Sequence, residues 1–120
     1  PLSGAPQVYA QGQGGLLDVR LDPKDETVAY FTYSKPVGKE ATTALARAKI
    51  SGNKLTELKD LFVADAASDE NIHFGSRIEF DRSGHIFLTI GDRNQRQRVQ
   101  DLRYHNGKII RLNKDGSVPK

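Results

Sequence analysis

Cysteine, methionine and tryptophan are all missing from this chain of 120 residues. Without cysteine there can be no disulfide, no zinc–thiolate site and no thiol nucleophile. No apolar run approaches the roughly 20 residues that a membrane-spanning helix needs, so we expect no membrane partner. No signal-like segment opens the chain. The absence of methionine even at position 1, together with a last residue that falls in a loop, favours a processed product or an excised piece of a longer protein.

The residues that are present allow one globular domain at most. Hydrophobic residues make up 37% and charged residues 28% of the chain, and the net charge is +3. This mild positive charge suits anionic ligands but does not by itself indicate nucleic acid. The arginines at positions 93, 96, 98 and 103 form a basic run. Because this run lacks the interleaved aromatic residues of a stacking platform, we predict a solvated loop there and no nucleic-acid partner.

Short segments rich in β-branched and aromatic residues, separated by turns, predict an all-β fold. The expected strands are residues 16–21, 27–33, 42–50, 54–62, 77–80, 85–90 and 107–113. The alanines of 42–50 also fit a helix, but the hairpin-type turn at 51–53 favours two strands. Residues 34–40 are expected to form a polar loop, and residues 93–104 a polar segment with room for a short helical turn.

One strand–turn–strand unit occurs twice. It is centred first on Asp22 and then on Asp81, 59 positions later. Repeats of about 40–60 residues built from strands and turns are typical of propeller blades. We therefore expect a single partial β-propeller domain over residues 1–120, with blade one at about 16–62 and blade two at about 77–113. Two blades leave strand edges and an apolar face exposed, so we expect the chain to bind the missing blades or to associate with itself.

The second unit brings a histidine and a carboxylate together at its open end. If the hairpin folds about residues 82–83, the numbers of facing residues sum to 165, so that His73 faces Asp92. Directly opposed residues have Cβ atoms about 4.5–5.5 Å apart. A carboxylate beside an imidazole fixes its tautomer and stabilises its protonated form, as a general base requires. The alternatives are a loop histidine that binds a backbone group and an aspartate that caps a turn.

The same register makes two further predictions for the hairpin, in which Ile78 faces Phe87 and Ser76 faces Thr89. A one-residue bulge would shift this register by one position. His85, beside the hairpin turn, is expected at the surface, and Arg77 is expected to face solvent or a carboxylate. His105 is expected to be part of a turn.

Several motifs, in order and at compatible spacing, resemble those of a known family. They are residues 12–19 (GQGGLLDV), 73–77 (HFGSR), 91–92 (GD), 100–102 (QDL), 107–113 (GKIIRLN) and 115–119 (DGSVP). With these motifs the chain resembles the soluble PQQ-dependent aldose sugar dehydrogenases of the glucose/sorbosone dehydrogenase family. The resemblance covers nearly the whole chain and is least marked between Ser34 and Ser68.

The resemblance implies about two blades of a six-bladed β-propeller. The parent enzyme would oxidise an aldose at its anomeric carbon to a lactone, with PQQ and calcium as cofactors, in the periplasm or outside the cell. His73 matches the family's catalytic base, Asp92 the acid that orients it, and Gln13 a glutamine next to the cofactor. Family enzymes are much longer, so most of the PQQ and calcium sites would lie outside this chain, and no residue is assigned to a metal.

The alternative function is a non-catalytic β-propeller fragment or binding module without activity of its own. Propeller scaffolds carry many unrelated functions, so the fold alone does not decide between the two. The aldose sugar would be the partner of the enzyme, and the missing half of the cofactor site favours an inactive piece when the chain is taken alone.

Overall fold

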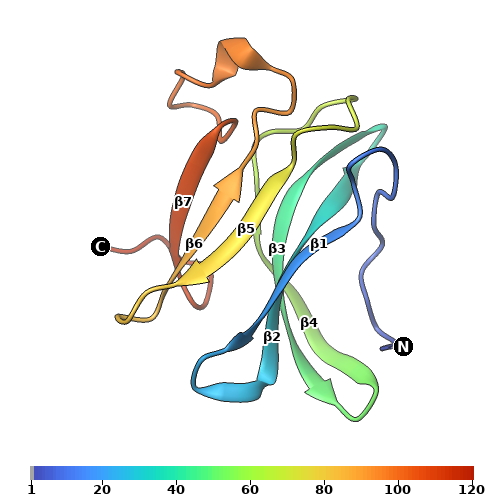
Figure 1. Cartoon of the computed structure of the whole chain (residues 1–120), viewed down its shortest axis with the longest axis vertical. Coiled ribbons are helices and arrows are strands. Elements are labelled where there is room, and N and C mark those ends of the chain that lie inside the picture. Colours follow the sequence, from blue (N-terminus) through green and yellow to red (C-terminus); the bar gives the residue numbers. More distant parts are fainter. Residues whose placement is uncertain (1) are drawn as a thin grey trace.

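The regular secondary structure of the protein is almost entirely β, arranged as two antiparallel sheets (Figure 1). The structure is a computed structural model that describes residues 2–120. The first sheet contains, in spatial order, β1 (Leu16–Asp22), β2 (Asp25–Val37), β3 (Glu40–Ser51) and β4 (Lys54–Val63); the second contains β5 (Gly75–Phe80), β6 (His85–Ile90) and β7 (Lys108–Asn113). A 3-10 turn, η1 (Arg96–Arg98), lies between β6 and β7. The all-β prediction is confirmed, including a strand rather than a helix over 42–50.

The predicted polar loop at 34–40 is wrong. Strand β2 continues through Pro36, and Val37 pairs with Glu40, so only Gly38 and Lys39 form the turn. Ser34, the first residue of the stretch 34–40, can be buried because its hydroxyl group is hydrogen-bonded to the main chain. Ser34 Oγ donates to the Tyr9 carbonyl oxygen at 2.6 Å and accepts from the Gly15 N–H at 2.7 Å.

The repeated unit seen in the sequence is repeated in the hydrogen bonds of its turns. Asp22 Oδ1 accepts the N–H of Lys24 at 2.8 Å, and Asp81 Oδ1 accepts the N–H of Ser83 at 2.9 Å. Both are the local turns that aspartate side chains favour. The first strands of the two units, β1 and β5, contact each other (Figure 1).

The main core lies between the two sheets. Its largest fully buried members are Tyr30 and Leu45 from the first sheet and Ile78, Ile86 and Leu88 from the second, each at most 1% exposed. Burying one such side chain contributes about 1.5–3 kcal/mol. The packing of the two sheets against each other therefore fixes the relative position of the loops at their ends.

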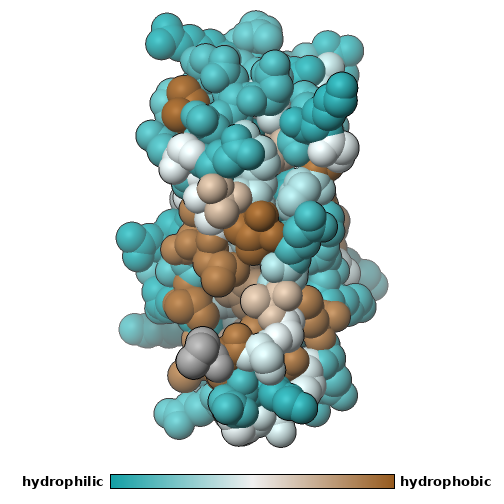
Figure 2. Space-filling view, turned by 90° about the vertical axis from the view of Figure 1, so that its right-hand side faces the viewer, coloured by the Kyte–Doolittle hydropathy of each residue, from teal (hydrophilic) through white to brown (hydrophobic). Residues whose placement is uncertain are grey.

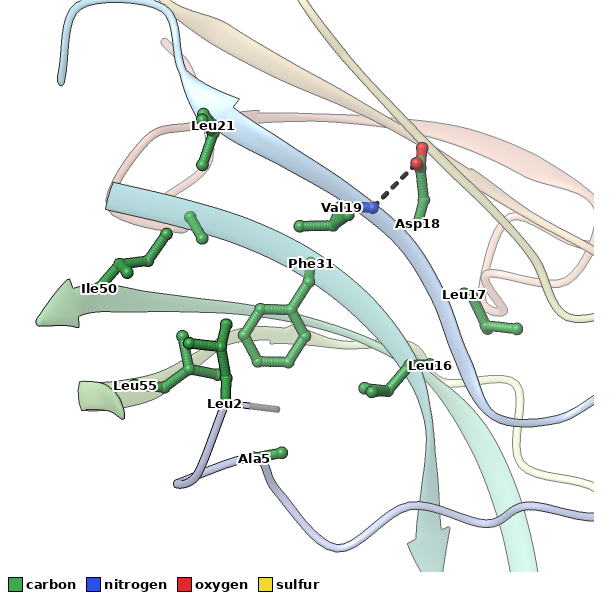
Figure 3. Close-up of a pocket in the computed structure, with 11 residues that line it drawn as sticks. Leu2, Ala5, Leu16, Leu17, Asp18, Val19, Leu21, Phe31, Ile50 and Leu55 are labelled. Atoms are coloured by element: carbon green, nitrogen blue, oxygen red, sulfur yellow. Dashed lines mark hydrogen bonds between the residues drawn. The ribbon is translucent and has the colours of Figure 1, made fainter. Parts of the chain in front are cut away.

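The other face of the first sheet is apolar and only partly covered: Phe31 and Tyr33 are buried there with Val8 and Leu55 packed against them, but the apolar side chains of β1 are exposed. Leu16 is 62%, Val19 63% and Leu21 46% exposed. Figure 2 shows apolar side chains gathered across the middle of this face, and Figure 3 shows how they surround a groove of about 490 Å³. Such a face is what the sequence predicted for a blade that lacks its neighbour. The lining residues are Leu2, Ala5, Leu16, Leu17, Asp18, Val19, Leu21, Ala29, Phe31, Ile50 and Leu55.

A half-buried histidine in the β6–β7 connection links it to the loop that follows β4. His105 Nδ1 accepts the N–H of Asp65 at 2.8 Å, and the N–H of His105 donates to the Asp65 carbonyl oxygen at 3.1 Å. The imidazole also lies against Phe62, with ring centroids 5.0 Å apart. Burial lowers the pKa of His105 below its ordinary value of 6.5.

We expect acidification to weaken this link and to lower the free energy of unfolding. Because the pKa of His105 is lower in the folded state, its contribution is fully present above the unfolded pKa near 6.5 and declines as pH falls below it. In His105→Asn the amide oxygen can still accept the Asp65 N–H but does not titrate, so this part of the pH dependence should disappear. Urea denaturation at several pH values measures the difference, and identical pH profiles for the two proteins would contradict the prediction.

Candidate active site

His73 is held by its main chain at the open end of the β5–β6 hairpin. Its N–H donates to Gln13 Oε1 at 2.9 Å, and its carbonyl oxygen accepts the N–H of Arg93 at 3.2 Å. Its φ of 59° lies in the left-handed region, which is uncommon for a residue other than glycine. The side chain is 45% exposed. The backbone is therefore fixed from two other segments while the imidazole faces outward.

The imidazole of His73 pairs with the carboxylate of Asp92. His73 Nδ1 lies 2.7 Å from Asp92 Oδ1, which also accepts the N–H of Asn94 at 2.9 Å. The Asn94 N–H, and after it the His73 ring, lower the pKa of Asp92 below its ordinary value. An anionic carboxylate only accepts hydrogen bonds, so Nδ1 carries the proton and Nε2 is the accepting nitrogen. Asp92 thus caps a turn and orients the histidine at the same time.

The strand register that led to this pair is wrong near the turn of the hairpin and right at its open end. Ile78 faces Leu88 and not Phe87, so the numbers of facing residues sum to 166 there. A register shift follows, and Gly75 faces Ile90, which restores the sum of 165.

The shift is a bulge at residues 76 and 77. Ser76 has a φ of 94° and does not pair with Thr89; the N–H of Arg77 donates to Thr89 Oγ1 at 2.9 Å instead. The extra residue in the bulge cancels the difference of one residue between the predicted and the observed register. For that reason His73 still faces Asp92.

Gln13 lies directly beside the pair, because its side chain holds the main chain of His73. Its own N–H donates to the carbonyl oxygen of Asn71 at 2.8 Å. Arg77 is exposed, with Nε 3.9 Å from a carboxylate oxygen of Asp18. His85, expected at the surface, is instead half-buried. Its Nδ1 lies 2.9 Å from Asp81 Oδ2, so a second His–Asp pair occupies the closed end of the hairpin.

The prediction of a solvated loop is wrong for Arg93, which is 0% exposed. Its guanidinium donates to four main-chain carbonyl oxygens around the His73 loop, those of Ala41, Ser68, Glu70 and Ile72. Asn106, also buried, donates from Nδ2 to the Asp92 carbonyl oxygen at 3.0 Å. Neither role has a signal in the sequence, because carbonyl acceptors belong to every residue and only the fold brings them together.

Within residues 2–120, no group of three or more His, Asp or Glu side chains is arranged to hold a metal ion. The same part of the chain has no helix of the length and apolar character needed to cross a membrane.

Comparison with known proteins identifies the family. The Glucose / Sorbosone dehydrogenase family model matches residues 1–120. The chain belongs to this family. It is 39% identical to the aldose sugar dehydrogenase YliI of Escherichia coli (strain K12) over 125 aligned residues, which cover 99% of this chain and 33% of that protein.

Solved structures of the family superpose on 92–100% of this chain. The apo-form crystal structure of the soluble aldose sugar dehydrogenase from Escherichia coli gives a TM-score of 0.94 at 38% identity, covering 100% of this chain and 36% of that one. The PQQ-bound form of aldose sugar dehydrogenase from Streptomyces coelicolor gives 0.78 at 26% identity, covering 92% and 34%. The chain spans about a third of the length of these relatives. Its two sheets are part of a β-propeller.

Proposed function

We propose that the protein to which this chain belongs oxidises an aldose at its anomeric carbon to a lactone, using PQQ and calcium, in the periplasm or outside the cell. His73 is the general base, Asp92 orients it, and Gln13 contacts the cofactor. The observation that carries the proposal is the hydrogen bond of 2.7 Å between His73 Nδ1 and Asp92 Oδ1. Membership of the family and the similarity to a PQQ-bound aldose sugar dehydrogenase support the choice of cofactor and substrate class.

The residues present fit the part of the reaction that moves a proton. Nε2 of His73 is the accepting nitrogen, and its side chain is 45% exposed, so a sugar hydroxyl can approach it. Nε2 takes the proton of the anomeric hydroxyl, and the Asp92 carboxylate stabilises the resulting imidazolium. Bound PQQ would supply the acceptor for the hydride that leaves the anomeric carbon. We assign the calcium ligands to no residue of this chain and place them in the rest of the parent protein.

The test is sugar-dependent dye reduction by the parent-length protein loaded with PQQ and calcium. We expect reduction with aldoses only when PQQ is present. Calorimetric titration with PQQ provides the control, because it shows whether the cofactor is bound. Saturable binding of PQQ without reduction of dye by any aldose would contradict the proposed function.

We further propose that the rest of the parent chain covers the apolar groove on the face of the first sheet that points away from the main core. Leu16, Val19 and Leu21 are too exposed for a chain that stays a monomer in water. We therefore expect this chain, prepared alone, to associate with itself, and static light scattering measures the mass. A well-folded monomer at micromolar concentration would contradict the expectation.

A further inference from the structure

We propose that Arg93 is a positioning residue that holds His73 in the conformation from which its imidazole reaches Asp92. The inference rests on the proposed function in one respect, namely that His73 acts as the base. The relevant structure is the contact of one buried guanidinium with the loop on both sides of this histidine.

Arg93 contacts three consecutive residues of that loop. Its guanidinium donates to the carbonyl oxygen of Ile72, its N–H donates to the carbonyl oxygen of His73, and its guanidinium lies over the ring of Phe74, 3.8 Å from the centroid. Phe74 is only 2% exposed. Because Arg93 directly follows Asp92 in the chain, one residue connects the loop of the base to the loop of its carboxylate.

The remaining donors of Arg93 fix where the loop begins. Its Nη2 atom donates to the carbonyl oxygens of Ala41 at 2.9 Å, Ser68 at 3.4 Å and Glu70 at 2.8 Å. Ala41 belongs to β3 and forms an isolated bridge with Ser68. The loop that carries His73 is thus anchored to the first sheet, while Asp92 follows β6 of the second sheet. Arg93 spans this junction.

Stability alone does not explain a residue of this kind at this place. The guanidinium is buried without a carboxylate partner among residues 2–120, its Nε has no hydrogen-bond partner there, and its φ is 51°. A buried unpaired donor and a left-handed backbone each have a cost in folding free energy. Such costs are retained where the structure needs a defined geometry. Here the residue that carries them, Arg93, lies next to the His73–Asp92 pair.

The donor geometry is specific to arginine. A guanidinium offers five N–H groups in a planar fork and stacks on an aromatic ring, whereas the lysine ammonium is a compact charge with three donors. A lysine at this position can donate to some of the main-chain carbonyl oxygens that Arg93 contacts, but it has no planar group to stack on Phe74. Arg93→Lys is therefore the conservative variant that separates the positioning role from simple filling of space.

The experiment measures the tautomer of His73 by ¹⁵N NMR of the parent-length protein at alkaline pH. In the wild type we expect the proton on Nδ1, because Asp92 accepts it. In Arg93→Met and Phe74→Leu we expect the ratio of the Nε2–H to the Nδ1–H tautomer to rise about five- to tenfold. This is the change expected when the hydrogen bond from Nδ1–H to Asp92 no longer favours the Nδ1–H tautomer. Arg93→Lys should give a smaller rise.

The matched control is Arg98→Met, which removes an arginine that also lies over an aromatic ring, that of Tyr104, at 4.3 Å. This variant should leave the His73 tautomer unchanged. An unchanged tautomer ratio in folded Arg93→Lys and Phe74→Leu would overturn the proposal and leave Arg93 a structural residue only. These two variants decide the question even if Arg93→Met does not fold. The measurement needs neither PQQ nor sugar, so failure of the proposed function would not affect its outcome.

Discussion

Replacing His73 by glutamine is expected to lower kcat for aldose oxidation by the PQQ-loaded parent protein by a factor of about 10²–10⁴, the usual contribution of a positioned general base. Glutamine is polar and of similar length, and its amide can still donate to Asp92. It cannot take up a proton at neutral pH, because an amide does not act as a base in this range. Steady-state dye reduction with saturating aldose measures the effect.

The chain offers a matched control in His85→Gln. His85 also pairs through Nδ1 with an aspartate, at 2.9 Å from Asp81 Oδ2, but at the closed end of the hairpin. We expect this variant to retain kcat and to lose at most some stability. Equal losses of kcat in both variants, with the cofactor bound, would mean that His73 acts through the fold and not as the base.

The second large effect is expected for Gly91→Ala. A Cβ atom at position 91 would lie 2.0 Å from the carbonyl oxygen of His73, and the other two nearest atoms, the carbonyl carbon of His73 and the nitrogen of Gly75, are also backbone. The Gly91 N–H donates to the Phe74 carbonyl oxygen at 3.2 Å, and its carbonyl oxygen accepts the N–H of Gly107 at 3.0 Å. We expect a loss of about 3 kcal/mol or more in the free energy of unfolding, since main chain must move to admit the methyl group.

Gly52→Ala is the control for this prediction. A Cβ atom there meets nothing within 4 Å, but φ is 60°, so the substitution introduces only the penalty of a left-handed backbone. That penalty is about 1–2 kcal/mol. Urea denaturation of both variants measures the difference. A cost for Gly91→Ala no greater than that for Gly52→Ala would show that the His73 loop yields easily, contrary to the rigid site described above.

Local signals in the sequence predicted most of the fold. Alternating apolar residues and Asp-led turns located the strands, since these features depend on neighbours within the same hairpin. The loop predicted at 34–40 failed because Ser34 has backbone partners at residues 9 and 15, far from it in the sequence. Polarity in a segment predicts exposure only when no distant group satisfies it.

The site could be predicted in part. Near the turn the strands pair one residue away from the predicted register, and the bulge at 76–77 returns them to it, so His73 and Asp92 come together. No residue of the hairpin predicts this bulge. Burial of Arg93 could not be predicted, since its partners are main-chain carbonyl oxygens of four other residues. Functional residues that bind through side chains are visible in a sequence, whereas those that act through the main chain of others become visible only in the fold.

The most direct test is ¹³C NMR of an aldose labelled at C1 and incubated with the parent-length protein, PQQ, calcium and an electron-accepting dye. With the wild type we predict that the C1 signal moves from the acetal region to that of a lactone or its hydrolysed acid, and that His73→Gln converts it far more slowly. Reduction of the dye while the C1 signal stays in the acetal region would contradict oxidation at the anomeric carbon. Equal conversion by His73→Gln would contradict the role of His73 as the base.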